Sequence, residues 1–178
     1  MEILNYILTD IKEPVTWLPI GILFGVLVES VVCFYRIYQK KQRQTWKEMI
    51  VVALFAAYLL IVLIQTLFSR EPGSRHGMDM IPFSTWGTNE QSHAYMIENV
   101  ILFLPFGILF PMAKEKNVHW KLIFACSFCF SVSLETVQLL TGRGFCQVDD
   151  VIMNTLGGCL GYLIYRGIKF LKHLVSDN

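Results

Sequence analysis

Apolar residues gather in five runs, each about as long as a helix that crosses a bilayer. The runs cover roughly residues 17–36, 50–68, 96–113, 121–141 and 151–170. About 20 helical residues, each rising 1.5 Å, span the hydrocarbon layer of a membrane. The pattern therefore predicts an all-α fold, a polytopic transmembrane bundle of about five helices.

A shorter pattern precedes the first run. Ile3, Leu4, Ile7 and Leu8 repeat at helical spacing with polar residues between them. Such spacing is typical of a short helix that lies in the headgroup plane, and a tethered tail is the alternative.

Composition supports the membrane interpretation. Of the 178 residues, 54% are hydrophobic and 16% are charged, whereas about 25% of a soluble protein is charged. The formal net charge is only +1, so the chain lacks the basic surface that nucleic acid requires. Composition thus argues against a soluble globular domain and against a nucleic-acid partner.

The distribution of basic residues predicts the orientation of the chain in the cell membrane. One side would hold Arg36, Lys40, Lys41, Arg43, Lys47, Lys114, Lys116, Lys121, Arg166, Lys169 and Lys172, and the other only Lys12, Arg70, Arg75 and Arg143. Because basic loops stay in the cytoplasm, we expect a multi-pass protein with its N-terminus outside and its C-terminus cytoplasmic. Segments 69–95 and 142–150 would then face outward.

Three carboxylates, Glu29, Glu98 and Glu135, lie within or at the ends of apolar runs. A charged side chain at the centre of a bilayer costs about 3 kcal/mol. These groups must therefore face protein, face water or carry a proton.

Polar residues recur at helical spacing near the predicted outer surface. Ser127, Ser131, Glu135 and Gln138 share one face of the fourth run, and Asp150 and Asn154 share one face of the fifth. We expect an outward-facing polar pocket that binds a ligand, although any one of these residues could instead be a structural hydrogen-bonding group. The predicted pocket residues are Glu98, Asn99, Glu135, Gln138, Arg143, Asp149, Asp150 and Asn154.

Small residues predict where helices approach closely. Gly157, Gly158 and Gly161 in the fifth run, and Gly21 and Gly25 in the first, suit helix packing in a membrane. We predict no metal and no cofactor, and we interpret His76 and His93 as ordinary loop histidines.

Four ordered motifs resemble the VanZ-like family, which is named for a teicoplanin-resistance protein of Gram-positive bacteria. They are Ile81-Pro82-Phe83, the stretch from Asn99 to Gly107, Glu135-x-x-Gln138, and Asp150-Val-Ile-x-Asn-Thr-x-Gly-Gly. The resemblance covers about residues 50–165. Where relatives often have an acid three residues before the position of Asp150, this chain has Gln147.

The resemblance implies a division of the chain. Residues 1–48 would form the interfacial segment, an added first transmembrane helix and a basic cytoplasmic loop. Residues 49–172 would form the VanZ-like four-helix membrane domain, and residues 173–178 a cytoplasmic tail.

The resemblance also implies a role in resistance to teicoplanin and other lipid-tailed antibiotics. In our first hypothesis, which is not enzymatic, the pocket binds or shields a membrane lipid or a lipid-linked cell-wall precursor of the outer leaflet. A lipid-tailed glycopeptide would be affected indirectly, by engaging the cell surface less.

Two alternatives remain open. The chain could be an enzyme that modifies a lipid, with Glu135 as base, Asp149 and Asp150 holding a divalent cation, and Arg143 binding phosphate. It could also be a transporter, but the polar groups stop in the predicted outer half of the membrane, with only Glu29 on the inner side.

Overall fold

The computed structural model describes residues 2–10, 12–41, 44–68, 71, 73, 77–84, 86, 89–114 and 118–176. Most of the described chain is helical. The helices are α1 (Glu2–Asp10), α2 (Lys12–Thr16), α3 (Leu18–Tyr38), α4 (Trp46–Leu63), the π-helix η1 (Ile64–Phe68), α5 (Glu90–Ala113), α6 (Trp120–Thr141) and α7 (Val148–Ser176). Two strands, β1 (Met78–Asp79) and β2 (Cys146–Gln147), pair in parallel.

The predicted all-α membrane bundle is confirmed. Within the described residues, four helices are long and apolar enough to cross a membrane, namely α3, α4 continued by η1, α5 and α6. The fifth apolar run lies in α7, which has 29 residues and is not among these four. Polar and small residues buried on its first half, such as Asn154 and Gly157, dilute its apolar character.

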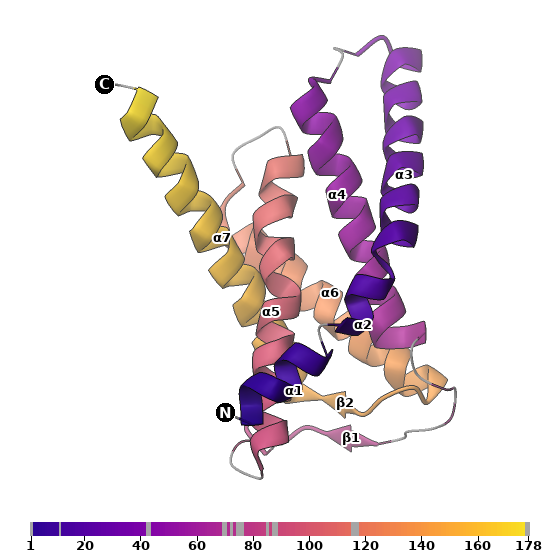
Figure 1. Ribbon diagram of the computed structural model, residues 1–178, viewed down its shortest axis with the longest axis vertical. Helices are drawn as coiled ribbons and strands as arrows, with labels where there is room; N and C mark the ends of the chain where they lie inside the picture. The colour runs from indigo at the N-terminus through magenta and orange to yellow at the C-terminus, as the bar shows by residue number, and fades with distance from the viewer. Residues whose placement is uncertain are drawn as a thin grey trace.

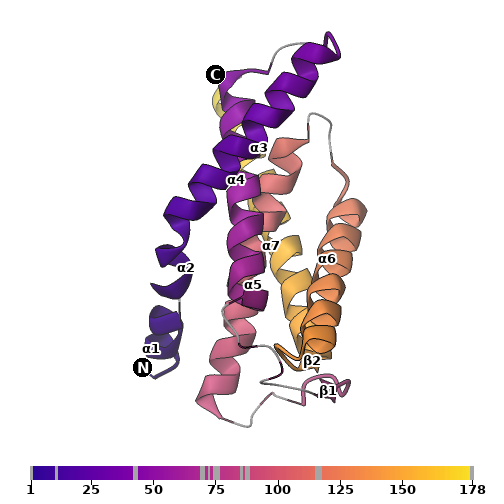
Figure 2. The same ribbon diagram turned by 90° about the vertical axis from the view of Figure 1, so that its right-hand side faces the viewer.

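The two ends of the bundle differ in chemistry. Figure 1 shows β1, β2 and the N-terminus at one end, which we call the strand end. The turn from α3 to α4 and the C-terminus lie at the opposite end, which we call the basic end because it holds Arg36, Lys41 and Lys169. Figure 2 shows α1 and α2 on one side of the bundle and α6 on the other.

An aromatic core joins α4, α5 and α6. Phe103 and Phe106 of α5 are buried, and the ring of Phe130 on α6 lies 5.5 Å and 5.7 Å from theirs. Val62, Leu67 and Leu134 complete the buried cluster. This core fixes the three helices whose ends meet at the strand end.

Glycines set the closest helix crossings. A Cβ at Gly157 of α7 would lie 2.3 Å from the carbonyl oxygen of Val100 on α5. A Cβ at Gly25 of α3 would likewise lie 2.2 Å from the carbonyl oxygen of Ala53 on α4. No side chain fits at these separations, so α5 and α7 touch through their backbones, as do α3 and α4.

Candidate functional site

The turn between α6 and α7 organises the strand end. Helix α6 ends at Thr141 and is capped by Gly142, whose φ of 62° is left-handed and therefore favours glycine. The chain then enters β2, where the amide of Cys146 donates to the carbonyl of Gly77 at 3.0 Å. This pairing holds the segment 77–84 against the turn 142–150.

Asp149 of α7 helps to hold the segment 77–84 in place. Its side chain is only 2% exposed, and its Oδ1 accepts a hydrogen bond from the backbone amide of Phe83 at 2.5 Å. Phe83 has a left-handed φ of 61°, which is unusual for a bulky residue. The bond to Asp149 is one of the contacts that favour this conformation.

Asp79 closes the same turn from its other side. Its Oδ2 accepts from the hydroxyl of Ser84, and its Oδ1 accepts from the amide of Ile81 at 3.1 Å. These two bonds, that from Ser84 first, hold the pKa of the Asp79 carboxyl below its ordinary value of 3.8.

The lowered pKa predicts how the turn responds to acid. The ionised Asp79 carboxylate contributes fully to the stability of the turn above its ordinary pKa. This contribution is lost as pH falls through the lower pKa of the folded state. In a variant that keeps Trp86 as its single tryptophan, the fluorescence change on acidification should have its midpoint below 3.8. Ser84→Ala should raise that midpoint, and an unchanged midpoint would contradict this account.

Two further polar contacts join helices at this end. The Nδ2 of Asn99 on α5 donates to Oδ1 of Asp150 on α7 at 2.7 Å. The Oε2 of Glu135 on α6 accepts from the backbone amide of Gln147 in β2 at 3.1 Å. The neighbouring residues Asp149 and Asp150 thus engage different elements.

Cys146 lies close to both of these carboxylates. Burial, followed by the negative charges of Glu135 and Asp150, raises the pKa of its thiol. A raised pKa keeps the thiol protonated at neutral pH, so Cys146 is a poor nucleophile here.

Gln138 and Arg143 reach a feature that the sequence pattern does not predict. The last turn of the second apolar run is a π-helix, and the Nε2 of Gln138 donates to the carbonyl of Thr66 in it at 2.9 Å. Arg143 donates to the carbonyl of Leu67 and lies over the ring of Phe68 at 5.3 Å. The guanidinium is therefore used, at least in part, to close the end of η1.

Asn154 lies one helical turn after Asp150 on α7. Its Nδ2 donates to the hydroxyl of Ser131 at 2.9 Å, while its Oδ1 is buried without a hydrogen-bond partner among the described residues. The hydroxyl of Ser127, a further turn along α6, is also buried without one. The two predicted polar stripes of α6 and α7 therefore face each other.

Glu98 does not join these contacts. Its carboxyl group instead lies close to Asp10, at the end of α1, and its Oε1 is buried without a hydrogen-bond partner among the described residues. Asn99, the next residue, turns toward α7. Of the other predicted pocket residues, Asn99 and Asp150 bond to each other, Glu135 and Asp149 accept from backbone amides, Gln138 and Arg143 donate to η1, and Asn154 donates to Ser131.

An exposed apolar surface covers the strand end, and the polar pattern alone did not predict it. The members of this apolar loop surface, with their exposed fractions, are Met78 (63%), Met80 (61%), Ile81 (70%), Phe83 (52%) and Trp86 (64%). Phe83 and Trp86 line a hollow of about 330 Å³. The Ile-Pro-Phe motif was the available signal, because it placed apolar residues in a segment expected to face outward.

Metal-ligand geometry is lacking in the described ranges. No group of three or more His, Cys, Asp or Glu side chains there could hold a metal ion. His93 lies in the first turn of α5 and not in a loop as predicted, and its ring centre is 5.8 Å from that of Trp86. His76 lies outside the described residues.

Most of the chain is similar in sequence to a known protein family. The sequence profile of the VanZ/LLP1 family matches residues 49–172, from the start of α4 into α7. The chain is 32% identical over 124 residues to Protein VanZ of Enterococcus faecium, and the alignment covers 63% of this chain and 71% of that protein. No solved structure matches. The chain therefore belongs to the VanZ/LLP1 family.

Proposed function

We propose that this protein lowers susceptibility to teicoplanin and other lipid-tailed antibiotics by binding an outer-leaflet lipid or a lipid-linked cell-wall precursor at its strand end. The bound molecule would be shielded, so less antibiotic would engage the cell surface. The proposal requires the strand end to face outward, as the distribution of basic residues predicts.

The observation that carries the proposal is the apolar loop surface held over buried polar groups. A lipid-linked molecule has an apolar tail beside a polar head. The strand end likewise has an exposed apolar surface beside polar side chains. Phe83 and Trp86 are exposed, while Asp149, which binds the Phe83 amide, is buried. Large exposed aromatic residues outside a helix suit contact with a lipid or an interface.

The polar contacts beneath this surface support binding more than catalysis. Asp149 and Glu135 each accept from a backbone amide, and Arg143 donates to a backbone carbonyl. Side chains with backbone partners hold neighbouring segments in place, which suits the shaping of a binding surface.

The test is resistance in a susceptible Gram-positive host that expresses the wild type or a variant at equal membrane level. We expect the wild type to raise the inhibitory concentration of teicoplanin and to leave that of a glycopeptide without a lipid tail unchanged. Phe83→Ala with Trp86→Ala should remove most of this increase, because a lost contact of 1.4 kcal/mol lowers affinity about tenfold.

The matched control is Leu140→Ala, which removes another exposed apolar side chain, 79% exposed, from α6. It should keep full resistance. Glu135→Ala, Arg143→Ala and Asp150→Ala should all reduce resistance. Full resistance in these three variants and in the Phe83 and Trp86 double variant would refute the proposal.

A further inference from the structure

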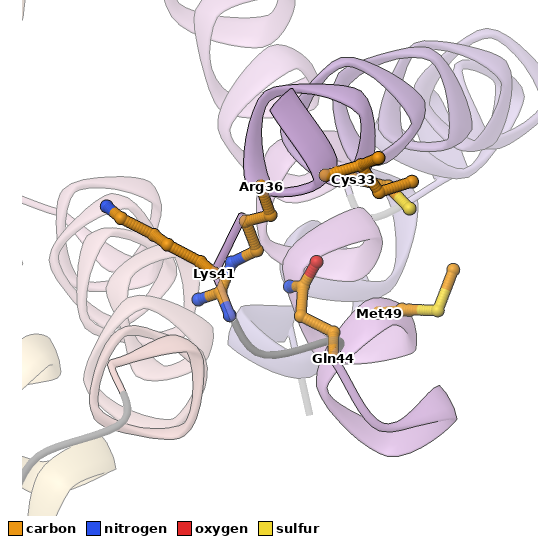
Figure 3. Close-up of a pocket in the computed structure, with 6 residues that line it drawn as sticks. Cys33, Arg36, Lys41, Gln44 and Met49 are labelled. Carbon is orange, nitrogen blue, oxygen red and sulfur yellow. The ribbon is translucent and has the colours of Figure 1, made fainter. Parts of the chain in front are cut away.

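A second cavity lies at the opposite, basic end of the bundle, where α3 ends and α4 begins. It has a volume of about 310 Å³. Its lining residues are Cys33, Arg36, Ile37, Lys41, Gln44 and Met49, most of which lie outside the region matched by the family. Figure 3 shows the side chains of Arg36 and Gln44 directed into the space between the two helices.

The polar groups of this cavity have complementary roles. Arg36 and Lys41 supply two cations, and Nζ of Lys41 lies 5.7 Å from the ring of Tyr35. Oε1 of Gln44 is buried without a hydrogen-bond partner among the described residues. A buried amide oxygen of this kind is stabilised by a ligand that donates a hydrogen bond.

The acidic groups nearby leave the cavity positive. Glu29, two turns before Arg36 on α3, acts on Arg36 through its charge. Glu48 of α4 is used in the capping box with Thr45, where it accepts from the Thr45 amide at 2.8 Å. A ligand for this cavity should therefore carry negative charge.

The apolar side of the cavity indicates a lipid rather than a soluble anion. Cys33, Ile37 and Met49 form that side. On the same end of α3, Phe34 and Tyr38 are 72% and 76% exposed, as side chains that face acyl chains are. The cavity thus lies where the apolar span meets the basic turn, at the depth of a lipid phosphate.

We propose that this cavity binds the headgroup of phosphatidylglycerol from the leaflet at the basic end, which is the inner leaflet in the predicted orientation. The phosphate pairs with Arg36 and also with Lys41 (Figure 3), whose side chain turns from its position near the Tyr35 ring to reach it, since guanidinium and ammonium groups both bind phosphate. A glycerol hydroxyl donates to Oε1 of Gln44. The first carbons of the lipid lie against Cys33, Ile37 and Met49.

Native mass spectrometry of the purified full-length protein in detergent tests this site. Phosphatidylglycerol should be retained at least about tenfold better than phosphatidylcholine with the same acyl chains, because the charge-assisted bonds favour a net anion. Arg36→Gln with Lys41→Gln should remove this preference. Free glycerol phosphate, which has the same polar groups without acyl chains, should not displace the lipid.

The matched control is Lys40→Gln with Lys47→Gln, which removes equal charge from the same end at residues that do not line the cavity. It should keep the preference. Equal loss in the control would show general attraction between charges and would overturn the site. Displacement by glycerol phosphate would overturn the lipid assignment.

Gln44→Ala decides the case if the double variant fails to fold. The wild type should prefer phosphatidylglycerol over phosphatidic acid, which carries the phosphate without the headgroup glycerol. Gln44→Ala should lose this preference and keep the preference over phosphatidylcholine. An unchanged preference over phosphatidic acid would overturn the assigned role of Gln44 and with it the proposed headgroup.

Discussion

Replacement of Gly157 by leucine is expected to separate α5 from α7 and to destabilise the bundle by about 3 kcal/mol or more, above the usual range for overpacking. A Cβ at this position would meet the carbonyl oxygen of Val100 at 2.3 Å and its Cα at 3.0 Å. Both are backbone atoms, so no change of rotamer relieves the clash. The whole of α5 would have to move.

Thermal unfolding of the purified protein in detergent measures this effect. Gly167→Leu is the matched control, because it makes the same change on the same helix at a site where the added Cβ meets no atom within 4 Å apart from the backbone of that helix. The control should unfold near the wild-type temperature. Equal stability of Gly157→Leu and Gly167→Leu would show that α5 and α7 do not cross as described.

Replacement of Asp149 by alanine is expected to release the segment 77–84 while the helices stay folded. The substitution removes the acceptor for the Phe83 amide and leaves that amide without its bond, at a cost of about 1–3 kcal/mol. Phe83 would then lose a contact that favours its left-handed φ of 61°. The apolar loop surface would no longer be held over the strand end.

Hydrogen exchange followed by mass spectrometry should show faster exchange in residues 77–84 of Asp149→Ala, with α5 and α6 unchanged. Asp150→Ala is the matched control, because it removes the neighbouring carboxylate, whose bond goes to Asn99 instead. If Asp150→Ala released the loop as strongly as Asp149→Ala, the separate roles of the two acids would be wrong. If the apolar loop surface binds lipid, Asp149→Ala should also lower teicoplanin resistance.

Helix positions followed from the sequence because the length of an apolar run is itself a physical requirement of the bilayer. All five runs lie in helices, although α7 was expected to look more apolar than it is. Its buried polar face includes Asp149 and Asn154, which face protein rather than lipid. Hydropathy averaged along a chain cannot distinguish these two environments.

The pairings within the site could be predicted only in part. Helical spacing brought the polar stripes of α6 and α7 together, and the bond between Asn154 and Ser131 shows this. Glu98 and Asn99 were assigned to one pocket because they lie at the same depth of the third run, but neighbours on a helix point about 100° apart. Glu98 contacts α1 instead, an element outside the predicted pocket.

The role of Gln147 shows why residue type alone misleads at a turn. The family resemblance led us to expect an acid at this position, whereas this chain has Gln147. In the structure it is the backbone amide of Gln147, and not its side chain, that contacts Glu135. A backbone contact has no side-chain signature in the sequence.

The sequence by itself determined the fold class, the apolar runs and the gathering of polar groups near one end, because burial of apolar area and the cost of charge in lipid act on each residue wherever the chain goes. Only the tertiary structure decided which groups meet. The Phe83 amide and Asp149 are 66 residues apart, and Arg143 and Leu67 are 76 apart. Local periodicity fixes the face of a helix, whereas the partner of that face depends on how separate segments pack.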